Sequence, residues 1–209
     1  MPSAHALAPQ GRASHLVGFY ESDDFLAEAV ADFLAPALLA DGIALVIATA
    51  DHRARFAAAM HDRVAAAGLV VDPERLVLLD AQATLATLEV DGALDPDRFD
   101  TVVAGHIERL VATGRSVHIY GEMVALLHAN ERALEALVLE DLWNRQGLRH
   151  HFELLCGYPL HLFDGDGSAG TFQAVCERHT GVTNESYAGL LETRSARTGA
   201  VVLDRETRR

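Results

Sequence analysis

Short apolar runs alternate with longer, alanine- and leucine-rich stretches along most of this 209-residue chain. The run Ile43–Thr49 is apolar up to its last residue, as expected for a parallel strand covered on both faces. Strands that alternate with helices are typical of an α/β fold, because parallel neighbours need a crossover connection. We therefore predict a three-layer α/β domain with a mostly parallel central sheet and helices on both faces. The expected strands are His15–Tyr20, Ile43–Thr49, Arg75–Asp80, Val117–Tyr120 and Phe152–Tyr158.

The length and composition favour a single folded domain. Half of the residues are hydrophobic, which is enough to form a full core. Residues 1–13 lack the apolar segment of a signal peptide, and we interpret them as a disordered lead-in. We expect the folded domain at residues 14–183 and a polar tail or linker at residues 184–209.

The charge of the chain excludes several classes of partner. A formal net charge of -13 disfavours binding to nucleic acid, which requires a basic surface to replace counterions. It also disfavours anionic membrane surfaces, and no apolar run is long enough to span a bilayer. Cys156 and Cys176 are too far apart for a CxxC motif, and we interpret them as buried free thiols. Free thiols indicate a reducing, cytoplasmic location.

The chain contains no lysine, which excludes two kinds of chemistry. A Schiff base needs a lysine amine, and a phosphate-binding P-loop needs the lysine of GxxxxGK[ST]. The apolar run that ends at Asp80 fits a Walker B pattern, but that pattern alone is common. Residues 165–170 fit GxGxxG, yet Asp164 and Asp166 would repel a pyrophosphate, and we expect no strand after the following helix. We interpret this segment as a turn.

Acidic residues lie at or just beyond the ends of four expected strands. If these strands are parallel neighbours, the carboxylates meet at one edge of the sheet, where α/β folds bind ligands. They could hold a hydrated magnesium ion or a polar ligand, or merely cap the helices that follow. Glu122 is the strongest candidate, either as a ligand contact or as an acid stabilised by a helix dipole. The four residues are Glu21, Asp51, Asp80 and Glu122.

The spacing of the eleven histidines forms no metal-binding signature, and we expect no metal site. His15, His118, His161 and His179 could still converge in space. There is no GxSxG nucleophile motif, and Cys156 lies in an apolar run that would raise its thiol pKa. We therefore expect no catalytic residues.

Four ordered motifs resemble those of the MEDS family, the methanogen/methylotroph DcmR sensory domain. They are HLVGFY at 15–20, YGEMVALL at 120–127, LEDLWN at 139–144 and LCGYP at 155–159. The resemblance covers about residues 14–182 and implies a relative of RecA/KaiC-type domains without a working P-loop. It implies a sensory role for small molecules, hydrocarbon derivatives among them. The family's recurrent positions correspond here to His15, Tyr20, Glu122, Trp143, Asn144, Cys156 and Tyr158.

From these observations we expect a non-catalytic, small-molecule sensory or signalling module of a bacterial or archaeal regulatory system. The expected ligand-binding residues are the four edge acids and the family positions given above. One alternative is a degenerate RecA-like nucleotide-binding protein, and another is an interaction module that docks on a kinase or anti-sigma partner. The candidate partners are a small-molecule ligand, a signalling protein and a second copy of the chain. The sequence identifies no cofactor.

Overall fold

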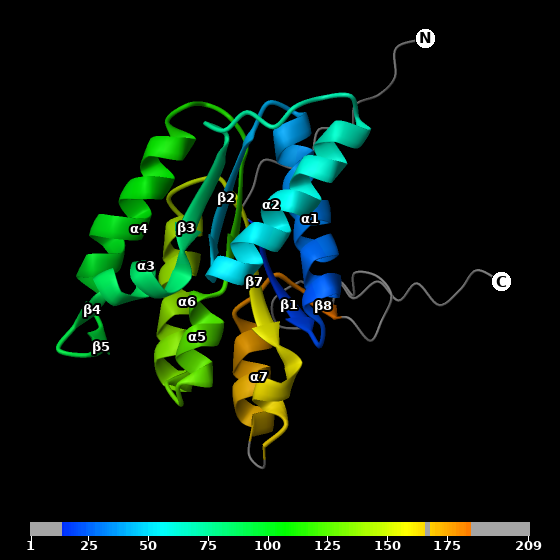
Figure 1. Cartoon of the computed structure of the whole chain (residues 1–209). Coiled ribbons are helices and arrows are strands. Elements are labelled where there is room, and N and C mark those ends of the chain that lie inside the picture. Colours follow the sequence, from blue (N-terminus) through cyan, green and yellow to red (C-terminus); the bar gives the residue numbers. More distant parts are fainter. Residues whose placement is uncertain (1–13, 166–167, 185–209) are drawn as a thin grey trace, which may run out of the picture.

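The computed structural model describes residues 14–165 and 168–184. The lead-in expected at residues 1–13 lies outside them, and so does the tail expected at residues 184–209 except for Asn184. Within the described residues, strands and helices alternate in the predicted way (Figure 1). No helix of the described residues is long and apolar enough to cross a membrane.

Six parallel strands form the central sheet, in the order β3-β2-β6-β7-β1-β8. The predicted three-layer α/β fold with a parallel sheet is therefore confirmed. The sixth strand, β8, was not expected, and it pairs with β1 after the last helix. Our argument that no strand follows the glycine-rich segment 165–170 is thus wrong. The strands are β1 (His15–Tyr20), β2 (Ile43–Ala48), β3 (Leu76–Asp80), β6 (Val117–Gly121), β7 (Glu153–Pro159) and β8 (Gly181–Asn184).

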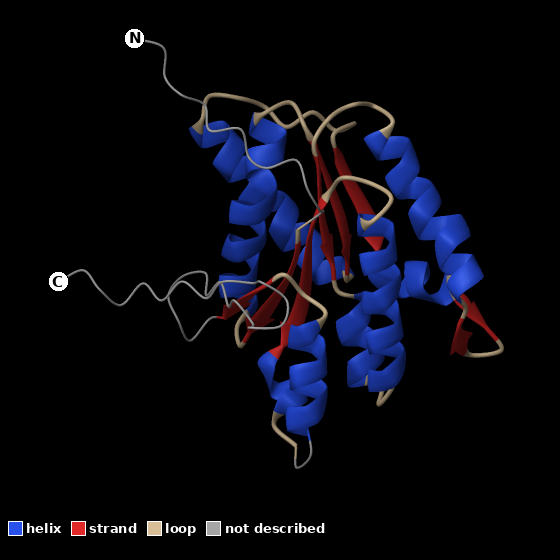
Figure 2. Ribbon diagram, turned by 180° about the vertical axis from the view of Figure 1, so that it is seen from behind, coloured by secondary structure: helices blue, strands red, loops and turns tan. Residues whose placement is uncertain are grey.

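Helices cover the sheet on both faces. Helices α1 and α2 pack together on one face, and the other helices cover the opposite face (Figures 1 and 2). A two-stranded hairpin, β4 (Glu89–Val90) and β5 (Ala93–Leu94), precedes α4. The helices are α1 (Asp23–Leu39), α2 (Ala50–Ala66), α3 (Ala81–Thr87), α4 (Pro96–Val111), α5 (Met123–Ala129), α6 (Ala133–Gly147) and α7 (Ser168–Glu177), with a 3₁₀ turn η1 (Leu160–Phe163).

Local signals fix several helix boundaries. Ser22 and Asp95 accept hydrogen bonds from backbone N–H groups in the first turns of α1 and α4, as N-caps should. Pro36 lies near the end of α1 and does not interrupt it. The helical stretch after β6 is divided into α5 and α6 at Glu131, whose φ of 62° is left-handed.

The alternation of side chains along the strands separates two cores. Val17 and Cys156 pack with α5, α6 and α7, whereas Tyr120 and Leu155 pack with α1 and α2. Since successive strand residues point to opposite faces, neighbours in sequence lie in different cores. Two strand residues can therefore contact each other only if their side chains lie on the same face of the sheet.

The close approach of β7 to Tyr120 gives a first prediction. A Cβ added at Gly157 would lie 2.3 Å from the Tyr120 hydroxyl oxygen and 3.0 Å from its ring carbon Cζ. Because Tyr120 is fully buried, it cannot move aside, and Gly157→Ala should cost about 1–3 kcal/mol in the free energy of unfolding.

The matched control is Gly105→Ala in α4, where an added Cβ meets only the end of a flexible arginine at 3.7 Å. That change should stabilise the protein by about 0.5–1 kcal/mol, because alanine favours helix over glycine. Urea unfolding of both variants measures the difference. Equal stability of the two variants would contradict the packing described for Tyr120.

Candidate functional site

The ten residues that the sequence singled out lie in two separate groups. The first group lies at the carboxyl ends of the strands and comprises Tyr20, Glu21, Asp51, Asp80 and Glu122. The second group lies on the sheet face that packs against α6 or on α6 itself, and comprises His15, Trp143, Asn144, Cys156 and Tyr158.

Glu122 is buried, with 2% of its surface exposed, and its carboxylate is held by protein donors. It occupies the N-cap position of α5 but makes no capping bond there. Instead, one oxygen accepts a hydrogen bond from the Thr49 backbone N–H at the start of α2. The other lies 2.6 Å from His52 Nδ1 and accepts from the Tyr120 hydroxyl at 3.2 Å. Glu122 therefore stabilises the start of a different helix from the one that the sequence suggested.

His52, which the sequence analysis did not single out, connects two carboxylates. Its Nδ1 faces Glu122, and its Nε2 lies 3.3 Å from Asp23 Oδ1 at the start of α1. Burial by itself lowers the pKa of His52, but the hydrogen bonds and charges of Glu122 and Asp23 outweigh it, and the pKa is raised. His52 thus joins α2 to both α1 and the β6–α5 junction. No sequence pattern signals this link, because it depends on the strand order.

The other edge acids do not converge with Glu122. Asp80 accepts a hydrogen bond from the Ala83 N–H as the N-cap of α3 and pairs with Arg53 at 2.8 Å. Asp51 is exposed in the first turn of α2, and Glu21 is exposed after β1. The strand order explains the separation of Glu21, since β1 lies two positions from β6 in the sheet. Capping by Asp80 matches the simpler of the two sequence interpretations.

On the opposite face, four buried side chains form what we call the histidine cluster: His15, Glu140, Cys156 and His179. Each is at most 4% exposed, and Glu140 and Cys156 are fully buried. Glu140 Oε2 lies 3.2 Å from His15 Nε2 and 3.4 Å from Cys156 Sγ, and Glu140 Oε1 lies 3.4 Å from His179 Nε2. The cluster therefore joins β1, β7, α6 and the α7–β8 connection.

Neighbouring groups hold the cluster in place. The Tyr158 hydroxyl donates to Glu140 Oε1 at 2.9 Å, and Asn144 Oδ1 lies 3.0 Å from His15 Nδ1. Burial lowers the pKa of His15 and outweighs the opposing charge and hydrogen bond of Glu140, which favours the neutral ring. Burial and the Glu140 charge raise the pKa of the Cys156 thiol, so that the free thiol is a poor nucleophile.

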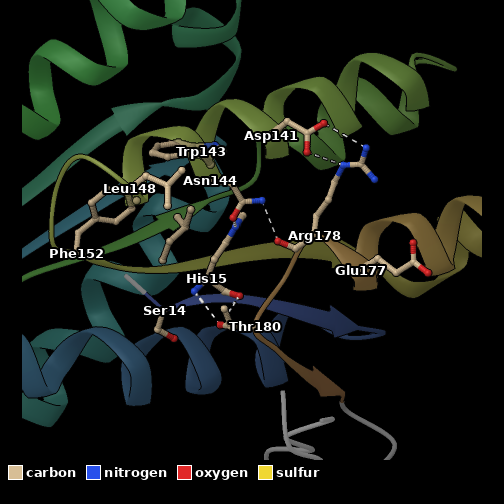
Figure 3. Close-up of a pocket in the computed structure, with 12 residues that line it drawn as sticks. Ser14, His15, Asp141, Trp143, Asn144, Leu148, Phe152, Glu177, Arg178 and Thr180 are labelled. Atoms are coloured by element: carbon tan, nitrogen blue, oxygen red, sulfur yellow. Dashed lines mark hydrogen bonds and ion pairs between the residues drawn. The ribbon is translucent and has the colours of Figure 1, made fainter. Parts of the chain in front are cut away.

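A pocket of about 340 Å³ opens beside the cluster, at the amino ends of β1 and β7 (Figure 3). His15 belongs both to the wall of the pocket and to the buried cluster, and its partner Asn144 also forms part of the wall. At its rim, Arg178 pairs with Asp141 at 3.0 Å. The apolar wall comprises Trp143, Leu148, Phe152 and Leu154, and the remaining lining residues include Ser14, Glu177 and Thr180.

Two further pockets lie elsewhere. One, of about 390 Å³, lies between α1 and β1 and is lined by Phe25, Phe33 and Leu155 among others. Another, of about 320 Å³, is lined by Asp80 and residues of α3 and α4. Glu122 and Tyr20 line none of these three pockets, and a ligand role for them stays a prediction.

Sequence reasoning did not select two members of the histidine cluster. Glu140 lies inside the LEDLWN motif, one helical turn before Asn144, and that spacing could have placed both side chains on one face of α6. His15 and His179 do converge, with ring centroids 4.1 Å apart, whereas His118 bonds to the Phe33 carbonyl group on the other side. Of the two cysteines, Cys156 is buried, but Cys176 is only half-buried, contrary to expectation.

The contacts of Glu122 predict the effect of removing its charge. Glu122→Gln should lower the free energy of unfolding by about 1.5–3 kcal/mol, because a buried carboxylate loses charge-assisted hydrogen bonds. Asp51→Asn, in the exposed first turn of α2, should cost at most about 1 kcal/mol of dipole energy. Chemical denaturation of both variants measures these costs. A Glu122→Gln variant as stable as the wild type would show that the carboxylate serves something other than the fold.

The raised pKa of His52 predicts a pH dependence. The stability that protonated His52 adds is fully present below about pH 6.5 and is lost as the pH rises through the raised pKa. The difference in unfolding free energy between the wild type and His52→Gln should therefore be largest in acid and shrink towards alkaline pH. Asp23→Asn, which removes one of the two carboxylates paired with His52, should reduce this variation with pH. A His52 difference that grows with pH would contradict the pairing.

Comparisons with known proteins agree with the four motifs. The profile of the family described as "MEthanogen/methylotroph, DcmR Sensory domain" matches residues 14–179. A comparison with curated proteins found no match. A solved structure described as "Structural study of Project ID PH0250 from Pyrococcus horikoshii OT3" is similar with a TM-score of 0.48 and 8% identity, over 92% of each chain. Because the profile spans most of the sequence and every residue of the histidine cluster, this chain belongs to the MEDS family of sensory domains.

Proposed function

We propose that this chain is a non-catalytic sensory module that binds a small organic molecule in the pocket beside the histidine cluster. One observation carries the proposal: residues from three of the four family motifs meet at this pocket and the cluster behind it. His15 comes from the first motif, Trp143 and Asn144 from the third, and Cys156 from the fourth. A sensory family supports a role in signalling, and the pocket supplies a place for the signal molecule.

The lining indicates an amphipathic ligand. Trp143, Phe152 and Leu154 offer an apolar surface, while Asn144 and Thr180 offer polar groups close to it. A volume of about 340 Å³ falls within the usual range for small-molecule sites, about 300–1,000 Å³. A compact molecule with an apolar body and one polar group, such as an oxygenated hydrocarbon, satisfies both parts of the wall.

The contacts of Asn144 and Arg178 connect the pocket to the α7–β8 connection. Asn144 donates a hydrogen bond to the Arg178 carbonyl group at 2.9 Å, and the Asp141–Arg178 ion pair joins α6 to the end of α7. A ligand that contacts Asn144 therefore acts on the connection between α7 and β8. A ligand can shift a conformational equilibrium only through such differential contacts.

The two alternatives from the sequence have less support. In the nucleotide-binding alternative Asp80 would hold a metal–nucleotide complex, but its carboxylate is engaged by Ala83 and Arg53. Titration with magnesium and ATP in a calorimeter should produce no binding heat if the sensory proposal is correct. A module that docks on a signalling protein would need only an exposed surface. The pocket beside the histidine cluster would have no function in that alternative.

Blocking the pocket tests the proposal. Leu148, at the end of α6, lines the pocket yet is 72% exposed, so that Leu148→Trp can narrow the pocket without disturbing the core. In a thermal-shift screen of small alcohols, ketones and halogenated hydrocarbons, compounds that stabilise the wild type should lose at least about tenfold in affinity for this variant, which corresponds to about 1.4 kcal/mol.

Two controls make this result specific. Leu134→Trp alters an 80% exposed leucine at the other end of α6 and should bind normally. Ala29→Trp obstructs the pocket between α1 and β1 and should also leave binding intact. If Ala29→Trp abolishes binding while Leu148→Trp does not, the ligand occupies the other pocket and the proposed site is wrong.

A further inference from the structure

The histidine cluster has the dimensions of a metal-binding shell. One ligand atom from each of His15, Glu140, Cys156 and His179 lies within 4.8 Å of all the others. The carboxylate oxygens of Glu140 lie 3.2 Å from His15 Nε2 and 3.4 Å from His179 Nε2. Cys156 Sγ lies 3.3 Å from His15 Nε2. Ligands of tetrahedral zinc, with bonds of about 2.0–2.3 Å, are about 3.3–3.8 Å apart. The widest separations need to shrink by about 1 Å to reach that range.

The hydrogen bonds of His179 direct a lone pair into the cluster. Its Nδ1 lies 2.7 Å from the Val175 carbonyl oxygen, which can only accept, so that Nδ1 carries the proton. In the neutral ring Nε2 is then an acceptor, and it faces Glu140 Oε1, another acceptor. Within the described residues this nitrogen has no hydrogen-bond partner, and its side chain is fully buried.

His15 is oriented in the same way. The Asn144 amide nitrogen donates to the Arg178 carbonyl group, which leaves the Asn144 oxygen facing His15 Nδ1. His15 Nδ1 must therefore donate, and its Nε2 lone pair points at Glu140 and Cys156. Metal-binding histidines are typically fixed by just such a second hydrogen bond from the far ring nitrogen.

We propose that His15, Glu140, Cys156 and His179 together bind one divalent zinc-type ion. Two imidazole nitrogens, a carboxylate and a thiolate suit zinc, and the four ligands would complete a tetrahedral shell. On binding, the Cys156 thiol loses its proton to solvent, and the two negative charges of Cys156 and Glu140 balance the ion. The metal thus neutralises a fully buried carboxylate and connects two strands, α6 and the α7–β8 connection.

A proton is the competing occupant. A proton on His179 Nε2 would join that ring to Glu140, but it would leave His15 Nε2 and Glu140 Oε2 as acceptors 3.2 Å apart. Among the residues that the structure describes, only the weakly donating thiol of Cys156 lies close to both. A single divalent ion engages all four ligand atoms, and we favour it for that reason. The proposal does not depend on which molecule occupies the neighbouring pocket.

Metal analysis of the purified chain, with any affinity tag removed, tests the proposal. Because the site is buried, we expect the ion to be incorporated during folding. One portion of the purified protein is therefore unfolded, treated with a chelator and refolded in the presence of zinc or cobalt. We expect about one ion per chain. Refolding with cobalt should give the near-ultraviolet absorption of a thiolate–cobalt bond. X-ray absorption of the zinc form should show one sulfur at about 2.3 Å and nitrogen or oxygen at about 2.0–2.2 Å.

Matched variants locate the ion. Cys156→Ser should remove the thiolate absorption and His179→Gln should reduce the metal content, whereas Cys176→Ser and His61→Gln should match the wild type. If the first two variants fail to fold, the wild-type X-ray absorption still decides, because it reports sulfur directly. Wild-type protein that refolds without taking up either metal, or that binds metal with no sulfur in the shell, would overturn the proposal.

Discussion

A sheet buried on both faces imposes the main constraint on this molecule. Each polar side chain on its strands must find a partner inside the protein, because an unpaired buried polar group costs several kcal/mol. Tyr158, Cys156 and His15 meet this requirement through Glu140 on one face. Tyr120 meets it through Glu122 at the sheet edge. Two buried carboxylates therefore organise the polar interior, and each also connects a helix to the sheet.

The two carboxylates use different means of stabilisation. Glu122 combines a helix N-terminus with a half-buried histidine, His52, that reaches a second acid. In the described part of the chain, the contacts of Glu140 are instead two histidines, a thiol and a hydroxyl group. The Glu122 oxygens are thus hydrogen-bonded to a backbone N–H group, a hydroxyl group and an imidazole ring of the protein. The arrangement around Glu140 leaves two nitrogen lone pairs directed at an anion, which is why we assign a cation to it.

The fold could be predicted from the sequence because its signals are local. Apolar runs such as Ile43–Ala48 and caps such as Ser22 depend on neighbouring residues alone. The strand β8 was missed because its four residues, Gly181–Asn184, include only one strongly apolar side chain. These residues form a strand because their backbone pairs with β1, and this pairing is seen only in the tertiary structure.

The candidate site was less predictable, for a specific reason. In a strand covered on both faces the sequence is continuously apolar, so that the period of two that would reveal each face is hidden. Alternation along the strand places Cys156 and Leu155 on opposite faces, but nothing in the run Leu154–Tyr158 shows which helices cover each face. The division of the motif residues between the two faces therefore required the strand order. His179 lies 164 positions after His15, and no spacing rule connects them.

The strand order also bears on how the protein is made. Among the described strands, β1 leaves the ribosome first, whereas its two partners in the sheet, β7 and β8, leave last. Until residues 153–184 have been synthesised, β1 lacks both of its neighbouring strands. Contacts of such high sequence separation form slowly and expose nascent chains to aggregation. The histidine cluster and its pocket, which contain residues from both ends of this span, therefore assemble in the final stage of folding.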